Sequence, residues 1–230
     1  HWGSSLWVPS FLGGLVSVFL IVYVWRRRNV TGALALIPLL SAVAIWSFGY
    51  TGELVSDALS TKLLFARINW LGISTVPTLW LLFGLRYTGR DRWMRPSHLA
   101  ALAVVPVVVV VLAWTNDLHH LMWRPVRMDR SGAIPFLAFD YVSLYWVFLA
   151  YSYGVAGTGF GLVGLRWMRT RGLVRKQAGL LVLSGLIPLL GNLVFNLGFS
   201  PIPGLDWTPV FFSISTMLWT WALFTFGIAG

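Results

Sequence analysis

Seven uncharged, apolar stretches follow one another along the chain, each close to the length that crosses a lipid bilayer. A helix rises ~1.5 Å per residue, so roughly 20 apolar residues span the hydrocarbon core. The mean hydropathy of +0.76 and the charged fraction of only 10% exclude an ordinary soluble protein. We therefore predict an all-α, integral membrane seven-helix bundle that forms one domain over residues 1–230. The expected helices cover about residues 6–25, 33–55, 63–87, 96–114, 141–166, 177–199 and 209–230.

The basic residues indicate how this bundle is oriented. Twelve of the 17 lysines and arginines fall in the three connections on the carboxyl-terminal side, around residues 26–28, 86–95 and 166–176. Because basic loop residues are retained in the cytoplasm, we predict an outside amino terminus and a cytoplasmic carboxyl terminus. The net charge of +10 then reflects topology and attraction to anionic headgroups. Membrane lipids are the expected partners, and nucleic acid is not.

The connection over residues 115–140 is much longer than the others. A connection of 26 residues usually has a function or its own structure. Loose alternation of apolar and polar residues from Gly132 to Phe139 predicts a small hairpin or cap there.

Polar residues within or beside the helices gather in the predicted outer half. Such groups should face the bundle interior and pair with one another, and Glu53 with Arg67 is the pair we expect. Asn192 and Asn196 lie one turn apart and share a helix face. We predict an outward-facing polar vestibule below the long connection, although a satisfied network that only holds the helices together fits equally. The candidate ligand-binding residues are Glu53, Arg67, Asn69, Trp70, Asn116, His119, His120, Asn192, Asn196 and Asp206.

Four glycines recur at helical spacing in the predicted fifth helix: Gly154, Gly157, Gly161 and Gly164. A face of small residues lets another helix approach closely. Two interpretations stay open, which are tight packing within the chain and contact with a second copy or another membrane subunit.

Several kinds of chemistry lack the residues that they need. The chain has no cysteine, and His119 and His120 are adjacent and point in different directions, so we predict no metal site. No histidine pair on facing helices is available for haem, and no lysine after Lys176 is available for a retinal Schiff base. No cofactor is predicted. No catalytic motif is present either, so we expect no enzymatic activity in this segment.

A series of local motifs resembles one known family. Its members here include Asn69–Ser74, Tyr87–Arg90, Trp114–Trp123, Arg175–Gln177 and Pro203–Pro209, in the same order over roughly residues 33–230. These strings resemble the N-terminal seven-transmembrane sensor domain of prokaryotic histidine kinases. The resemblance implies a sensory input module in the cytoplasmic membrane, and a kinase core, if any, would lie beyond residue 230.

Two functions therefore compete. The first is a sensory domain that binds a small or membrane-soluble ligand in the vestibule and shifts the last two helices. The second is a structural subunit, derived from a sensor, that packs in a larger membrane complex. A channel or transporter is disfavoured because the polar residues do not continue through the cytoplasmic half of the helices.

Overall fold

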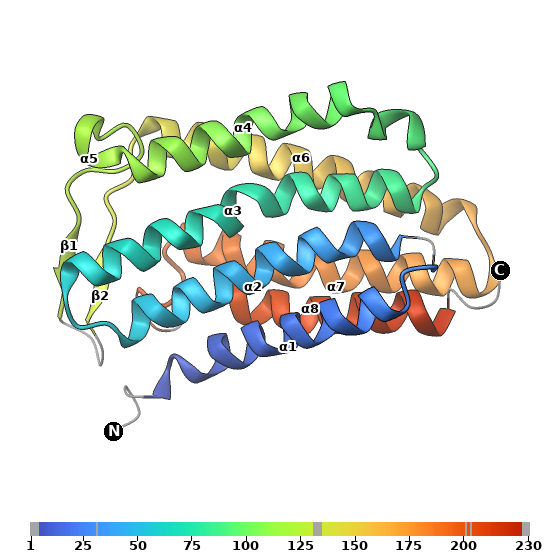
Figure 1. The fold of residues 1–230 in the computed structure, drawn as a ribbon, viewed down its shortest axis with the longest axis horizontal. Coiled ribbons are helices and arrows are strands. Elements are labelled where there is room, and N and C mark those ends of the chain that lie inside the picture. The colour runs from blue at the N-terminus through green and yellow to red at the C-terminus, as the bar shows by residue number, and fades with distance from the viewer. Residues whose placement is uncertain (1–4, 31, 131–134, 201, 203, 227–230) are drawn as a thin grey trace.

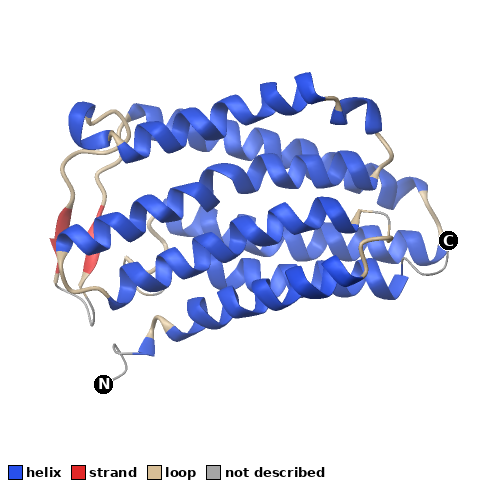
Figure 2. Ribbon diagram, in the orientation of Figure 1, coloured by secondary structure: helices blue, strands red, loops and turns tan. Residues whose placement is uncertain are grey.

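The computed structural model describes residues 5–30, 32–130, 135–200, 202 and 204–226, and it confirms the all-α seven-helix bundle (Figures 1 and 2). Seven helices in this part of the chain are long and apolar enough to span a membrane. They are α1 (Val8–Arg26), α2 (Ala33–Val55), α3 (Leu59–Tyr87), α4 (Pro96–Trp114), α6 (Ser143–Arg169), α7 (Gly172–Asn196) and α8 (Thr208–Phe226). The end of the predicted seventh helix, residues 227–230, lies outside the described residues.

Two helices begin earlier than the apolar pattern indicates. Helix α3 starts at Leu59 rather than near 63, and α7 starts at Gly172 rather than near 177. The apolar run marks the thickness of hydrocarbon, whereas backbone hydrogen bonding continues into the headgroup region, where charged side chains are tolerated. Lys62, Arg175 and Lys176 consequently lie within helices.

Six of the helices close into a ring. Each packs on the next in the order α1, α2, α3, α6, α7 and α8, and α8 returns to α1. Helix α4 lies outside this ring against α3, at the top of Figure 1, with Val104, Val107 and Val111 exposed toward the surrounding lipid. Close approach of α3 to α2 depends on Gly72, since a Cβ there would lie 2.5 Å from the Ala42 carbonyl oxygen. The ring therefore has an interior in which a site can form.

The alternating helices place their connections at two opposite ends. The end at which α1, α3 and α6 finish carries most of the basic residues, and we call it the arginine end. The other end, on the left in Figure 1, carries the long connection between α4 and α6, and we call it the loop end.

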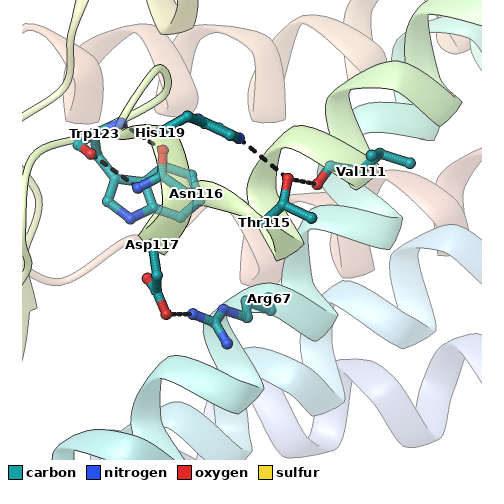
Figure 3. A network of polar contacts seen from close by, with 7 residues as sticks. All are labelled: Arg67, Val111, Thr115, Asn116, Asp117, His119 and Trp123. Carbon is teal, nitrogen blue, oxygen red and sulfur yellow. Dashed lines mark hydrogen bonds and ion pairs between the residues drawn. The ribbon is translucent and has the colours of Figure 1, made fainter.

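The long connection is folded. It contains a short helix, α5 (Asn116–His119), and two antiparallel strands, β1 (Arg127–Asp129) and β2 (Phe136–Ala138). The Asn116 side chain is buried, accepts a hydrogen bond from the Met122 N–H at 2.9 Å and donates one to the Trp123 carbonyl at 2.9 Å (Figure 3). The hairpin pairs β2, which lies within the predicted stretch Gly132–Phe139, with β1, which precedes that stretch; residues 132–134 lie outside the described residues. The side chain of Asn116 therefore holds α5 against the residues that follow it. We call the folded long connection, residues 115–140, the cap.

Candidate functional site

A cavity of about 90 Å³ lies inside the ring at the loop end, and we call it the polar cavity. Its wall comes from α2, α3, α6 and α7, from the residues before α8, and from the long connection, where Leu137 and Phe139 contribute. Six of the ten predicted ligand-binding residues line it: Glu53, Asn69, Trp70, Asn192, Asn196 and Asp206. The structure therefore brings together predicted polar residues from three helices and one connection, below the long connection.

Glu53 is the acidic residue of α2 in this cavity, and its side chain is 8% exposed. Its Oε2 accepts a hydrogen bond from Asn69 Nδ2 at 2.9 Å. Among the described residues, no hydrogen-bond donor reaches its Oε1. The buried Lys62 Nζ donates to the Glu53 backbone carbonyl at 2.6 Å, so its charge acts on the nearby carboxylate without a hydrogen bond to it.

The predicted ion pair between Glu53 and Arg67 is wrong. Arg67 instead pairs with Asp117 of α5 (Figure 3). Trp114 Nε1 also donates to the Arg67 carbonyl at 3.1 Å. The reason is helical geometry: residues 67 and 69 are separated by about 200° around α3, so they point to nearly opposite sides. Asn69 faces α2 and Glu53, whereas Arg67 faces α4 and the cap.

Asp206 lies just before α8 and supplies the second carboxylate. Its Oδ1 accepts a hydrogen bond from the Thr208 N–H at 2.9 Å, as expected for a residue at the start of a helix. Its own N–H donates to Tyr50 Oη at 2.7 Å. Burial raises the pKa of Asp206 from 3.8 to about 6, because surrounding protein disfavours the charged carboxylate. Burial also raises the pKa of Tyr141, another wall residue, well above its usual 10.

The two asparagines of α7 connect three helices. Asn196 Oδ1 accepts a hydrogen bond from Tyr145 of α6, and Asn192 Oδ1 accepts one from Tyr153 of α6 at 3.0 Å. Asn192 Nδ2 also lies 3.5 Å from Thr208 Oγ1 of α8. A molecule that enters the polar cavity would therefore meet groups whose positions depend on α6, α7 and α8 together.

The other four candidates do not line the cavity. Arg67, Asn116 and His119 belong to the contacts that fold the cap: His119 Nδ1 accepts from the Leu121 N–H at 3.0 Å, and its Nε2 lies 3.1 Å from Thr115 Oγ1 (Figure 3). His120 is exposed, with a positive φ of 50°. Their positions in the sequence suggested the vestibule, but the side chains of Arg67, Asn116 and His119 make contacts within the long connection or to it, and His120 is exposed.

A second cavity of about 90 Å³ adjoins the polar cavity deeper in the ring, and we call it the aromatic cavity. The two share the wall residues Trp46, Ile73, Tyr145 and Asn192. The remaining wall is mostly apolar, with rings from α3, α6 and α8. Those rings belong to Trp80, Phe148, Phe160, Phe212 and Trp219.

Sequence reasoning missed the aromatic cavity. Tryptophans in membrane proteins are enriched at the membrane interface, so Trp46, Trp80 and Trp219 do not stand out in the sequence as residues that line a cavity. The available signal was position: Trp46 and Trp219 lie near the middle of their helices, too deep for an interfacial role. Trp80 stacks on Trp219 with ring centroids 4.8 Å apart, which closes the deep side of this space.

The fold defines the class of this protein as a multi-pass membrane protein built from seven helices, with a polar and an apolar cavity inside the ring. The family model described as the N-terminal 7TM region of histidine kinase matches residues 9–229. The match covers nearly the whole chain, so the chain belongs to this family, and the resemblance seen in its motifs is confirmed. The family is an N-terminal sensory region, which is a non-catalytic input region. The comparison with curated proteins finds no match.

Proposed function

We propose that this chain is the sensory input domain of a histidine kinase, and that the polar cavity is where it binds a small or membrane-soluble ligand. The family assignment supports an input role, and the cavity supports a binding site because it joins buried polar groups from several helices. We place the domain in a prokaryotic cytoplasmic membrane with its arginine end in the cytoplasm, as basic connections favour.

The observation that carries the proposal is that one helix, α7, takes part in polar contacts at both ends of the bundle. At the loop end, Asn192 and Asn196 line the cavity. At the arginine end, the buried Gln177 accepts a hydrogen bond from Tyr87 Oη at 2.7 Å. Gln177 Nε2 also lies 3.3 Å from the Ala222 carbonyl of α8. A shift of α7 at the cavity would therefore change the contacts of α8 near its carboxyl end.

A ligand changes the signalling state only if it binds two arrangements of the bundle with different affinity. The proposed difference is a displacement of α7 and α8 relative to α3 and α6. Pro188 lies inside α7 between Gln177 and Asn192, and an internal proline removes one backbone hydrogen bond and favours a bend. This position suits a helix that moves as two segments.

Thermal unfolding of the purified domain in lipid nanodiscs tests ligand binding. A compound that binds the folded state raises the unfolding temperature by mass action. We expect the rise to be lost in Glu53→Gln and kept in Asp117→Asn, which removes an acid at the loop end outside the cavity. A rise that is equal in both variants would contradict binding at the polar cavity.

Coupling to output needs a second measurement, in a histidine kinase that carries this domain ahead of its kinase core. A compound that raises the unfolding temperature should also change the rate of autophosphorylation. Gln177→Ala should reduce this response while the compound still binds. An undiminished response would show that the contact from Gln177 to α8 does not carry the signal.

The structural-subunit alternative has one observation in its favour, the glycine face of α6. A Cβ added at Gly154, Gly157, Gly161 or Gly164 would meet no atom of the described residues within 4 Å. Packing of these four glycines within the chain is therefore wrong, and the face is open to a second copy or another membrane subunit. Because the chain lacks cysteine, Gly157→Cys permits a clean crosslinking test. Disulfide-linked dimers in native membranes would support self-association, and Leu183→Cys on exposed α7 is the matched control.

A further inference from the structure

The polar cavity is lined by carboxylate and amide groups, whereas the aromatic cavity is lined mostly by rings. Together the two linings indicate which kind of ligand would fit. They share four wall residues, so the two cavities lie side by side inside the ring. The polar cavity contains the carboxylates of Glu53 and Asp206. Among the described residues, no lysine, arginine or histidine side chain contributes to its wall. This end of the space therefore favours a positive charge or hydrogen-bond donors.

The Glu53 carboxylate has hydrogen-bonding capacity that the described residues do not use, whereas Asp206 is partly occupied. Glu53 Oε1 receives no hydrogen bond from the described residues, and Lys62 is held at the backbone carbonyl of Glu53. Asp206 Oδ1 is occupied by the Thr208 N–H. Hydrogen bonds from a charged donor to a carboxylate are about twice as strong as neutral ones, so an ammonium group is well matched to this pair.

The aromatic cavity provides the second, independent observation. Its Ser152 hydroxyl is on the cavity wall, 7% exposed, and makes no hydrogen bond within the described structure. A buried polar atom without a partner is costly, and a ligand that occupies the space would remove that cost. The surrounding rings of Trp80, Phe160 and Trp219 favour an apolar or aromatic body, and aromatic faces also attract cations.

We propose that the two cavities together bind one amphipathic amine, with its ammonium group between Glu53 and Asp206 and its apolar body among the rings of the aromatic cavity. This inference rests on the proposed sensory function and names the class of ligand for the same site. The ammonium would contact the connection before α8, while the body would contact α6 and α7. An amine long enough to reach both cavities would therefore stabilise one arrangement of these three helices.

Three probes of matched shape test the charge preference: 4-phenylbutylamine, 4-phenylbutanol and 4-phenylbutyrate. Binding is measured by isothermal titration to the domain in phosphatidylcholine nanodiscs, with empty nanodiscs subtracted to remove partition into lipid. We expect the amine to bind about tenfold more tightly than the alcohol, because it alone forms charge-assisted hydrogen bonds. The carboxylate should bind more weakly than the alcohol. Equal affinity for all three, or tighter binding of the carboxylate, would overturn the proposal.

Variants locate the two ends of the ligand. Glu53→Gln and Asp206→Asn should each reduce affinity for the amine about tenfold and leave affinity for the alcohol nearly unchanged. Phe160→Leu should weaken amine and alcohol by a similar factor, and Asp117→Asn should change neither. Amine binding that is insensitive to both acid variants would refute the assigned position. If Glu53→Gln does not fold, Asp206→Asn alone still decides the question.

The outcome also separates this inference from the sensory function itself. If 4-phenylbutanol or 4-phenylbutyrate binds at the cavity and the amine does not, the ligand class is wrong while ligand sensing is supported. If a screen of cationic, neutral and anionic compounds produces no shift in unfolding temperature, both the ligand class and the binding function fail.

Discussion

Replacement of Asp206 by asparagine should make the domain more stable near neutral pH, although it removes a hydrogen-bonded carboxylate. Asparagine has nearly the same shape, and its Oδ1 still accepts the hydrogen bond that the Thr208 N–H donates to Asp206 at 2.9 Å. What the substitution removes is the cost of holding a charge inside the protein. The pKa of Asp206 is raised from 3.8 to about 6, chiefly by burial.

The magnitude follows from that pKa difference. When the folded pKa of an acid is above its unfolded pKa, the stability that protonation provides is present below the unfolded value and lost as pH rises through the folded value. For Asp206 the loss therefore occurs between about pH 4 and pH 6. With 1.36 kcal/mol for each pKa unit, the cost at pH 7 is of order 3 kcal/mol at most, and the partial exposure of Asp206 reduces it.

The assay is unfolding of wild type and Asp206→Asn in nanodiscs between pH 4 and pH 8. The difference between the two unfolding temperatures reports the removal of this carboxylate together with its electrostatic effect on neighbouring groups such as Tyr141, because the rest of the sequence is common to both proteins. We expect similar values at pH 4 and a higher unfolding temperature for the variant at pH 7. A variant that is less stable than wild type at pH 7, or a difference that does not depend on pH, would refute the reasoning. We expect the variant to be more stable but to bind amines less tightly, because a buried charge that serves binding commonly lowers the stability of the fold.

Three further predictions test other parts of the structure. Gln177→Ala leaves the buried Tyr87 hydroxyl without its acceptor, so the free energy of unfolding should fall by about 1–3 kcal/mol. Denaturant titration in micelles measures this change, and an unchanged free energy of unfolding would contradict the contact. Asn116→Ala removes the three hydrogen bonds that its side chain makes to Met122 and Trp123, and limited proteolysis should cut the long connection faster than in wild type while the helices stay intact. For orientation, a membrane-impermeant maleimide should label Leu118→Cys in intact cells and Arg92→Cys only after permeabilisation, and the reverse pattern would overturn the predicted topology.

The sequence alone determined the number of helices and the pairing of polar residues that share one helix. Apolar runs of bilayer length make helices the only way to satisfy backbone hydrogen bonds in hydrocarbon, so the seven spans were predictable. Asn192 and Asn196 were likewise predictable as neighbours, because one helical turn separates them. The motifs around Asn69 and Trp114 also sufficed to indicate the family, which the match of the family model to residues 9–229 confirms.

Contacts between helices were decided only by the tertiary structure. Arg67 and Asn69 are two residues apart, yet the rotation of α3 in the ring sends Asn69 to Glu53 and Arg67 to Asp117. The aromatic cavity is formed by rings from α2, α3, α6 and α8, and no local pattern along the chain records that Trp80 meets Trp219. Periodicity determines which residues share a face of one helix, whereas the rotation and neighbour of each helix depend on close packing of the whole ring.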